Sequence, residues 1–120
     1  MKIRIIPICL IATLLCFGKK TSAQDRNTKY GSSALANITT GDDNTAFGWG
    51  AIYTSTGCTG NTATGYNALY STTPGTFNTA DGSKALMFNT TGIYNTAEGY
   101  KALYANTSGN CNTAAGAGAG

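Results

Sequence analysis

The sequence has no histidine among its 120 residues, and charged residues make up only 11% of it. Without histidine, a serine or cysteine nucleophile has no imidazole base, and zinc loses one of its commonest ligands. Serine and threonine are plentiful, but no plausible general base accompanies them. The phosphate-loop pattern G-x-x-x-x-G-K-[ST] is also absent, although the chain contains 16 glycines. We therefore expect no enzyme activity, no catalytic residue, no bound metal and no cofactor.

Long apolar runs are confined to the N-terminus. Lys2 and Arg4 precede the apolar stretch Ile5–Phe17, and small residues follow at Thr21-Ser22-Ala23. This three-part pattern is typical of a cleaved secretory signal peptide. We therefore predict a signal peptide over residues 1–23, a short linker over 24–26, and a mature chain that is secreted or held at the cell surface.

Two other interpretations of the N-terminus are weaker. A membrane anchor would need about 20 apolar residues, whereas this run is shorter and is interrupted by Pro7. A lipoprotein signal through Cys16 is disfavoured by the large side chains of Leu14 and Leu15. We accordingly expect no membrane span in the mature chain.

Charge of either sign is scarce after the predicted signal peptide. The remaining chain holds four basic and five acidic residues, a net charge of −1. No basic patch is left to neutralise phosphates. We therefore predict no binding to nucleic acid.

What the sequence does contain is a repeat. The triplet Asn-Thr-Ala begins at residues 44, 61, 78, 95 and 112, always seventeen residues apart, and a degenerate copy begins at Asn27. We number the columns of the repeat from this asparagine. Threonine holds column two and glycine column five in all six copies, and alanine holds column eight. The predicted structural ladders are Asn44, Asn61, Asn78 and Asn95; Gly48, Gly65, Gly82 and Gly99; and Ala51, Ala68, Ala85 and Ala102.

A fixed column must meet the same surroundings in every copy, which favours a solenoid with one coil per repeat. Seventeen residues are too few for a helix–turn–helix unit, which needs roughly 33. Glycine, threonine and asparagine also disfavour helix interiors and suit short strands with tight turns. We predict an all-β fold over residues 27–120: a parallel β-solenoid, or β-roll, whose coils stack at ~4.8 Å with ladders of like side chains.

Columns three and nine are the predicted interior, with the alanine of column eight at a corner. One leucine or isoleucine per coil, with small residues, makes a thin core, and small domains already bury little surface. We expect subunits to share a core, most simply as a homotrimer. A monomeric flattened coil is the alternative.

Cys58 and Cys111 are the cysteines outside the predicted signal peptide. They lie about three coils apart, or roughly 14 Å along the solenoid axis. A disulfide needs Cα atoms within ~7 Å. We therefore predict no bridge within the chain, and pairing between chains stays open.

The string NTA-x-G-Y-x-A-L-Y-x-x-T-x-G at Asn61–Gly75 and Asn95–Gly109 resembles the repeats of bacterial tail-fibre-domain proteins. It is more distantly similar to the head repeats of trimeric autotransporter adhesins. The resemblance covers Asn27 to Gly116 and implies an exported fibre, a trimer of β-rolls, and binding to other surfaces. Such fibres typically end in a self-cleaving chaperone domain, so we expect the chain to be the N-terminal part of a longer fibre or a truncated gene product.

Aromatic residues provide the candidate recognition surface. They recur in column six, which Ser83 interrupts, and in column ten, which Met87 interrupts. Tyrosine and tryptophan can dock a surface glycan or a protein ligand because they combine a large apolar ring with a polar tip. The alternative is a purely structural stack. The candidate residues are Trp49, Tyr66 and Tyr100 in column six, and Tyr53, Tyr70 and Tyr104 in column ten.

Two acidic groups have a weaker claim to function. Asp81 and Glu98 share column four, about 5 Å apart in adjacent coils, and paired carboxylates can be catalytic. We expect instead that Lys84 and Lys101 offset them across a turn. The segment Gly41–Thr45 has carboxylates for calcium but lacks the spacing of a calcium loop, and we expect a solvated turn.

The predicted function is therefore a structural and adhesive segment of an exported fibre or surface protein. An ice-binding solenoid that uses threonine ladders is the alternative. It is disfavoured because ice-binding solenoids present paired Thr-x-Thr rows, whereas columns two and thirteen lie far apart.

Overall fold

The protein is described by a computed structural model over residues 26–120. The signal peptide predicted for residues 1–23 and most of the predicted linker lie outside the described residues. Within them the chain forms nine short strands and no helix, and hence no helix that could cross a membrane. The strands are β1 (Thr28–Tyr30), β2 (Asn37–Ile38), β3 (Thr45–Phe47), β4 (Thr54–Ser55), β5 (Thr62–Thr64), β6 (Ser71–Thr72), β7 (Thr79–Asp81), β8 (Thr96–Glu98) and β9 (Thr113–Ala115).

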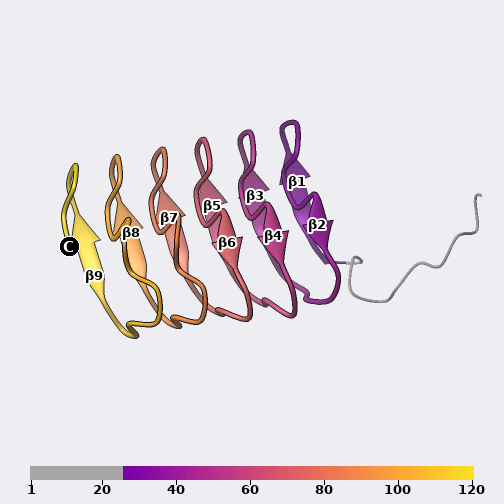
Figure 1. The fold of residues 1–120 in the computed structure, drawn as a ribbon. Coiled ribbons are helices and arrows are strands. Elements are labelled where there is room, and N and C mark those ends of the chain that lie inside the picture. Colours follow the sequence, from indigo (N-terminus) through magenta and orange to yellow (C-terminus); the bar gives the residue numbers. More distant parts are fainter. Residues whose placement is uncertain (1–25) are drawn as a thin grey trace, which may run out of the picture.

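The strands form a parallel β-solenoid with one coil per repeat (Figure 1). One sheet has six strands in the order β1-β3-β5-β7-β8-β9, and every neighbouring pair is parallel. Equivalent residues pair directly, as Thr45 does with Thr62 and Thr62 with Thr79. This register confirms the predicted period of seventeen residues and the predicted all-β class.

A second sheet has only three strands, β2-β4-β6, and ends halfway along the stack. In the next two coils the chain turns at this position instead of continuing as a strand. The backbone N–H groups of Asn89 and Asn106 donate to the carbonyls of Leu86 and Leu103, each at 3.1 Å. One side of the solenoid therefore changes from strand to turn along the axis.

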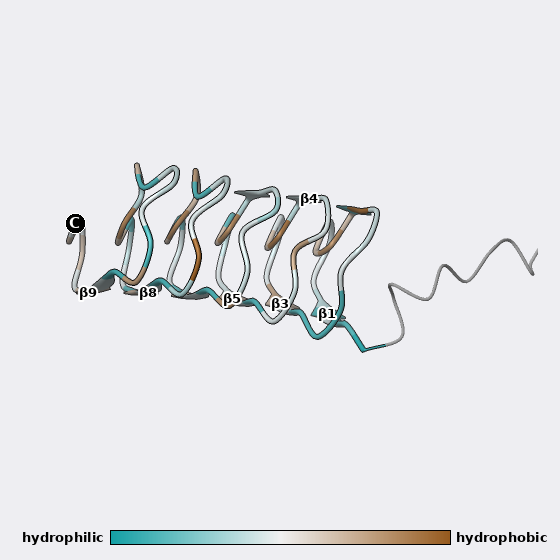
Figure 2. Cartoon of the chain, turned by 90° about the horizontal axis from the view of Figure 1, so that it is seen from below, coloured by the Kyte–Doolittle hydropathy of each residue, from teal (hydrophilic) through white to brown (hydrophobic). Residues whose placement is uncertain are grey.

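The core lies inside the coils and is built from columns three, eight and nine. Strands β5, β7 and β9 alternate between exposed and buried residues, with the alanine of column three inward. The column-nine side chains of Ile52, Leu69 and Leu86 are fully buried, as are the column-eight alanines beside them. Figure 2 shows apolar segments recurring at the same place in successive coils. The prediction for columns three and nine is confirmed.

This interior is closed within a single chain. The column-three, column-eight and column-nine side chains of the middle coils have no solvent exposure in the isolated chain. Sharing of a core between subunits is therefore not needed to bury them. The homotrimer stays a prediction, and any such assembly would have to pair the outer faces of the coils.

Glycine at column five allows the coils to approach closely. Gly65 has φ +125°, a region that favours glycine. A Cβ atom added there would lie 2.8 Å from the carbonyl carbon and oxygen of Gly82 in the next coil. Both the backbone conformation and the inter-coil contact therefore account for glycine in this column.

Candidate functional site

The column-one asparagines form a continuous ladder inside the coil. The Nδ2 group of Asn61 donates to Oδ1 of Asn44 (3.1 Å) and to the carbonyl of Gly75 (3.0 Å). Its Oδ1 accepts from the backbone N–H and the Nδ2 group of Asn78, at 2.9 and 3.2 Å. The same pattern recurs at Asn78 and Asn95. These amides are buried and fully hydrogen-bonded, so their role is structural.

Column six places aromatic rings on the outside, where the chain turns away from the six-stranded sheet. The rings of Trp49 and Tyr66 stack at a centroid distance of 5.2 Å and an angle of 14°. Trp49, Tyr66 and Tyr100 are 47%, 49% and 52% exposed. Ser83 holds this column in the coil between Tyr66 and Tyr100. About half of each of these side chains is thus available to a partner, and the ring stacking in this column joins Trp49 to Tyr66.

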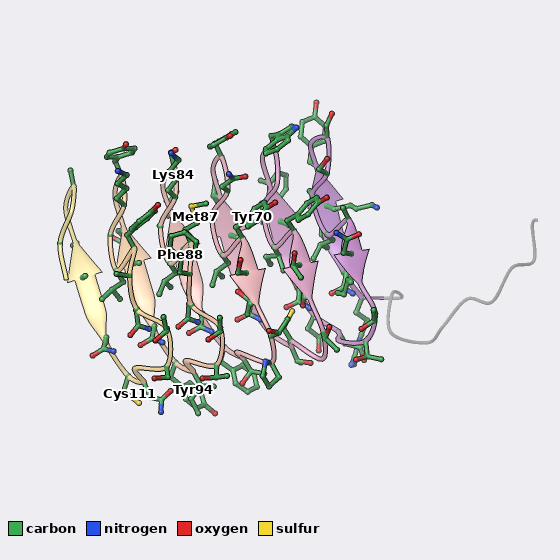
Figure 3. All side chains as sticks on the ribbon, viewed as in Figure 1. Tyr70, Lys84, Met87, Phe88, Tyr94 and Cys111 are labelled. Carbon is green, nitrogen blue, oxygen red and sulfur yellow. The ribbon has the colours of Figure 1, made fainter. Side chains whose placement is uncertain are left out.

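Column ten forms a second, less exposed row of rings. Tyr53 and Tyr70 stack at 4.9 Å and 5°. Met87 takes the next position, and Phe88 meets Tyr104 edge-on at 5.0 Å. Figure 3 shows Tyr70 and Met87 side by side in neighbouring coils. This row is therefore filled continuously along the middle of the molecule.

Lys101 joins the two aromatic rows. Its ammonium lies 5.4 Å from the ring centre of Tyr100 in column six and 5.2 Å from that of Tyr104 in column ten. Cations are attracted to the negative faces of aromatic rings at such distances. The two rows predicted as separate columns thus form one surface, which we call the aromatic surface: Trp49, Tyr66, Tyr100, Tyr53, Tyr70, Tyr104 and Lys101.

Two further pairs of exposed rings escaped the column analysis. Phe77 and Tyr94 stack at 5.2 Å and 11° in column seventeen, and Tyr30 and Phe47 lie 6.2 Å apart in column four. Tyr94 stands near Cys111 at the opposite edge of the coils from Lys84 (Figure 3). Both pairs have the seventeen-residue spacing. A column analysis that included the aromatic residues of columns four and seventeen would therefore have revealed them.

The acidic residues are arranged differently from the expectation. Asp81 and Glu98 pair in register in adjacent strands, as predicted. The expected compensation by lysine is wrong, because within residues 26–120 no ion pair joins either lysine to these carboxylates, and Lys101 lies over the tyrosine rings.

The Gly41–Thr45 segment contains an ion-paired turn. Arg26 contacts Asp42 at 3.3 Å and Asp43 at 3.1 Å. Over the described part of the chain, no group of three or more potential metal ligands comes together. These carboxylates therefore form ion pairs with Arg26 at the start of the first coil.

The two cysteines within the described residues, Cys58 and Cys111, are free thiols, in agreement with the distance argument. Cys58 is buried beside the hydroxyl of Ser55 and the Oδ1 of Asn44, and burial raises the pKa of its thiol. Cys111 is exposed. The two thiols thus differ sharply in their access to solvent.

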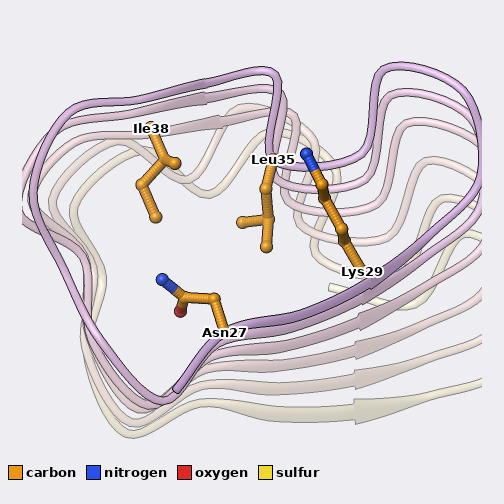
Figure 4. A pocket seen from close by; sticks show the side chains of 4 residues that line it. All are labelled: Asn27, Lys29, Leu35 and Ile38. Atoms are coloured by element: carbon orange, nitrogen blue, oxygen red, sulfur yellow. The ribbon is translucent and has the colours of Figure 1, made fainter. Parts of the chain in front are cut away.

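A small hollow opens at the first coil. Its volume is about 110 Å³, and it is lined by Asn27, Lys29, Leu35 and Ile38 (Figure 4). Leu35 belongs to the core, and Lys29 takes the column-three position that alanine fills in later coils. The hollow is the end of the solenoid interior, and no reactive group is gathered there.

No protein-family model, curated protein or solved structure matches the chain. The function must therefore be argued from the chain's own geometry. Of its surfaces, the aromatic surface brings together the most predicted recognition residues.

Proposed function

We propose that the chain is a structural and adhesive segment of an exported fibre or cell-surface protein, and that it performs no catalytic turnover. The structural part of this proposal is supported by the coil-to-coil bonding. Parallel strand pairing and the asparagine ladder link every coil to the next. Ladders of like groups give a stack that resists bending because each coil is hydrogen-bonded to the next along the six-stranded sheet and through the asparagine amides.

The adhesive part is carried by the aromatic surface. Its rings lie in register, and the column-six rings are about half exposed. Tyrosine and tryptophan are favoured where proteins meet partners, because they bury large areas at low entropic cost. Repetition along an axis would make many weak contacts act together. A surface glycan or a protein is the proposed ligand.

The resemblance to tail-fibre and adhesin-head repeats agrees with this proposal, as do the predicted export signal and surface location. A homotrimer would place three such surfaces around one fibre axis. Sedimentation analysis of the purified chain measures the oligomeric state directly, and a monomer at micromolar concentration would contradict the trimer.

The ice-binding alternative has less support. An ice-binding face would need regular threonine rows on a flat sheet, and the outer face of the six-stranded sheet carries threonine in column two. Column four beside it holds Tyr30, Phe47, Thr64, Asp81, Glu98 and Ala115. Only β5 therefore presents Thr-x-Thr.

The adhesive proposal is tested by the retention of the purified chain on immobilised glycans and matrix proteins. We expect the wild-type chain to be retained. A triple variant, Trp49→Ala, Tyr66→Ala and Tyr100→Ala, should not be retained. A Phe77→Ala, Tyr94→Ala variant removes exposed rings elsewhere and serves as the matched control. Equal retention of both variants would contradict the proposal, and thermal hysteresis in the wild-type chain would favour ice binding.

A further inference from the structure

Column seventeen carries exposed rings that lie outside the aromatic surface. Phe77 and Tyr94 stack at 5.2 Å and 11°, and they are 50% and 55% exposed. A Cβ atom added at Gly60, in the coil before, would lie 2.7 Å from Cδ1 of Phe77. The ring of Phe77 is therefore held between the coils on either side of it. The exposed Cys111 takes the same column in the coil after Tyr94.

The side of the solenoid that carries this row is uncharged over four coils. We call it the neutral side, and it consists of columns eleven to seventeen between residues 44 and 111. Its segments, residues 54–60, 71–77, 88–94 and 105–111, contain no aspartate, glutamate, lysine or arginine. In these columns charge occurs only in the first coil, where Asp42 and Asp43 pair with Arg26.

The other exposed columns carry like charges in neighbouring coils. Asp81 and Glu98 pair in register in column four, and Lys84 and Lys101 share column seven. When identical chains surround an axis parallel to the solenoid, each residue near that axis meets its own copy at the same height. Columns four and seven would then bring like charges together, which disfavours association. The neutral side is free of this repulsion.

The polar groups beside the rings suit an identical partner. Thr91 and Ser108 are exposed on the neutral side, and a hydroxyl group can both donate and accept a hydrogen bond. Each can therefore pair with the same residue of another copy. Aromatic residues combined with a lack of charge are also typical of the buried centre of protein interfaces. A charged partner, in contrast, would find no opposite charge here.

We propose that copies of the chain associate through the neutral side, parallel and in register, so that Phe77 and Tyr94 meet their counterparts in the other copies. This inference rests on the proposed homotrimer and names the surface that forms it. Cys111 belongs to the same column, so the exposed thiols of the copies also lie at one height.

The first experiment measures the mass of the assembly by sedimentation, on a chain that begins at residue 24. We expect the wild-type chain to sediment as a trimer. Tyr94→Lys should reduce it to a monomer, because it places like charges at one height around the axis. Tyr100→Lys is the matched control: Tyr100 is 52% exposed but lies in column six, so this variant should stay trimeric. Circular dichroism checks that both variants fold.

The second experiment uses Cys111 as a reporter and does not depend on Tyr94→Lys. The thiolate of Cys111 attacks oxidised glutathione and releases one glutathione thiolate. The thiolate of Cys111 from another copy then attacks the mixed disulfide, which forms the interchain S–S bond and releases the second glutathione. We expect a covalent dimer on a non-reducing gel. A Tyr100→Cys, Cys111→Ser variant moves the thiol to column six and should cross-link at least about tenfold more slowly, because assembly no longer brings the thiols together.

Three outcomes would overturn the inference: a monomeric wild-type chain, trimers of Tyr94→Lys, or equal cross-linking from columns six and seventeen. Retention on immobilised glycans and matrix proteins separates it from the adhesive function, because a monomer keeps its own aromatic surface. A monomeric wild-type chain that is still retained would reject the inference and keep the adhesive function. A trimer that cross-links through Cys111 but is not retained would reject the adhesive function and keep the inference.

Discussion

Among single residues, the column-one asparagines contribute most directly to the specificity of the stack. Each amide in the middle coils uses both donors and accepts two hydrogen bonds through its oxygen. No other side chain of similar size offers two donors and two acceptor sites in one plane. The ladder therefore requires asparagine in column one. It also fixes the register between neighbouring coils.

Replacement of Asn61 by alanine should be strongly destabilising. The substitution leaves the carbonyl of Gly75 and the backbone N–H of Asn78 without their partners in a buried site. We expect a loss of about 2–4 kcal/mol in the free energy of unfolding, measured by urea denaturation. Asn37→Ala, at an exposed asparagine in β2, should change it by less than about 0.5 kcal/mol. Similar losses at the two positions would contradict the structural role of the ladder.

Column nine imposes an unusual backbone on branched residues. Leu35, Leu69, Leu86 and Leu103 have φ between 48° and 50°, and Ile52 has φ 47°. Left-handed backbone is most strained for β-branched residues. We expect Ile52→Leu to raise the free energy of unfolding by about 0.5–1 kcal/mol and Leu69→Ile to lower it by at least as much. Thermal denaturation measures both, and a gain from Leu69→Ile would show that packing outweighs the strain.

The two thiols should differ in reactivity. Cys58 is buried with a raised thiol pKa, and the thiolate is the reactive form. We expect iodoacetamide to modify the exposed Cys111 rapidly in the folded chain and Cys58 only after denaturation, as followed by mass spectrometry. In a chain that begins at residue 24, the Cys111→Ser variant keeps Cys58 as its one cysteine and should be inert until it unfolds. Rapid modification of that variant under native conditions would contradict its burial.

At the scale of elements, repetition predicted the six-stranded sheet and its inward columns but not the second sheet. Columns one to three are nearly invariant, so their backbone had to be the same in every coil. Columns eleven and twelve change from Thr54-Ser55 and Ser71-Thr72 to Phe88-Asn89. There the backbone N–H of Asn89 donates to the carbonyl of Leu86 in the same coil. This local hydrogen bond replaces the pairing with a strand of the neighbouring coil.

The close approach of the coils can be measured at column five. Gly65→Ala meets both a left-handed backbone and the carbonyl of Gly82 in the next coil, whereas Gly116→Ala has φ +118° and nothing within 4 Å. The difference between the two variants isolates the inter-coil clash from the backbone strain. We expect Gly65→Ala to cost about 1–3 kcal/mol more than Gly116→Ala in chemical denaturation. Equal costs would assign the glycine column to backbone strain alone.

The aromatic surface shows where sequence reasoning reached its limit. The columns gave the residues that stack, because a fixed spacing places them above one another. The columns did not predict that Lys101 lies over Tyr100 and Tyr104, because an exposed lysine can adopt many rotamers. They also did not show that one chain closes its own core, which depends on the left-handed backbone that turns column nine inward.

For the whole molecule, each coil contacts only its neighbours, so stability should be a sum over coils and their interfaces. Deletion of residues 62–78 removes one full period and joins Asn61 to Thr79, so every column stays in register. We expect this variant to fold cooperatively with a lower Tm. Deletion of residues 62–69 removes less chain but leaves half a coil, which cannot follow the path through β5 and β6. It should lose more stability than the longer deletion, as measured by circular dichroism melting. If stability instead followed the number of residues removed, the coil of seventeen residues would not be the unit of this fold.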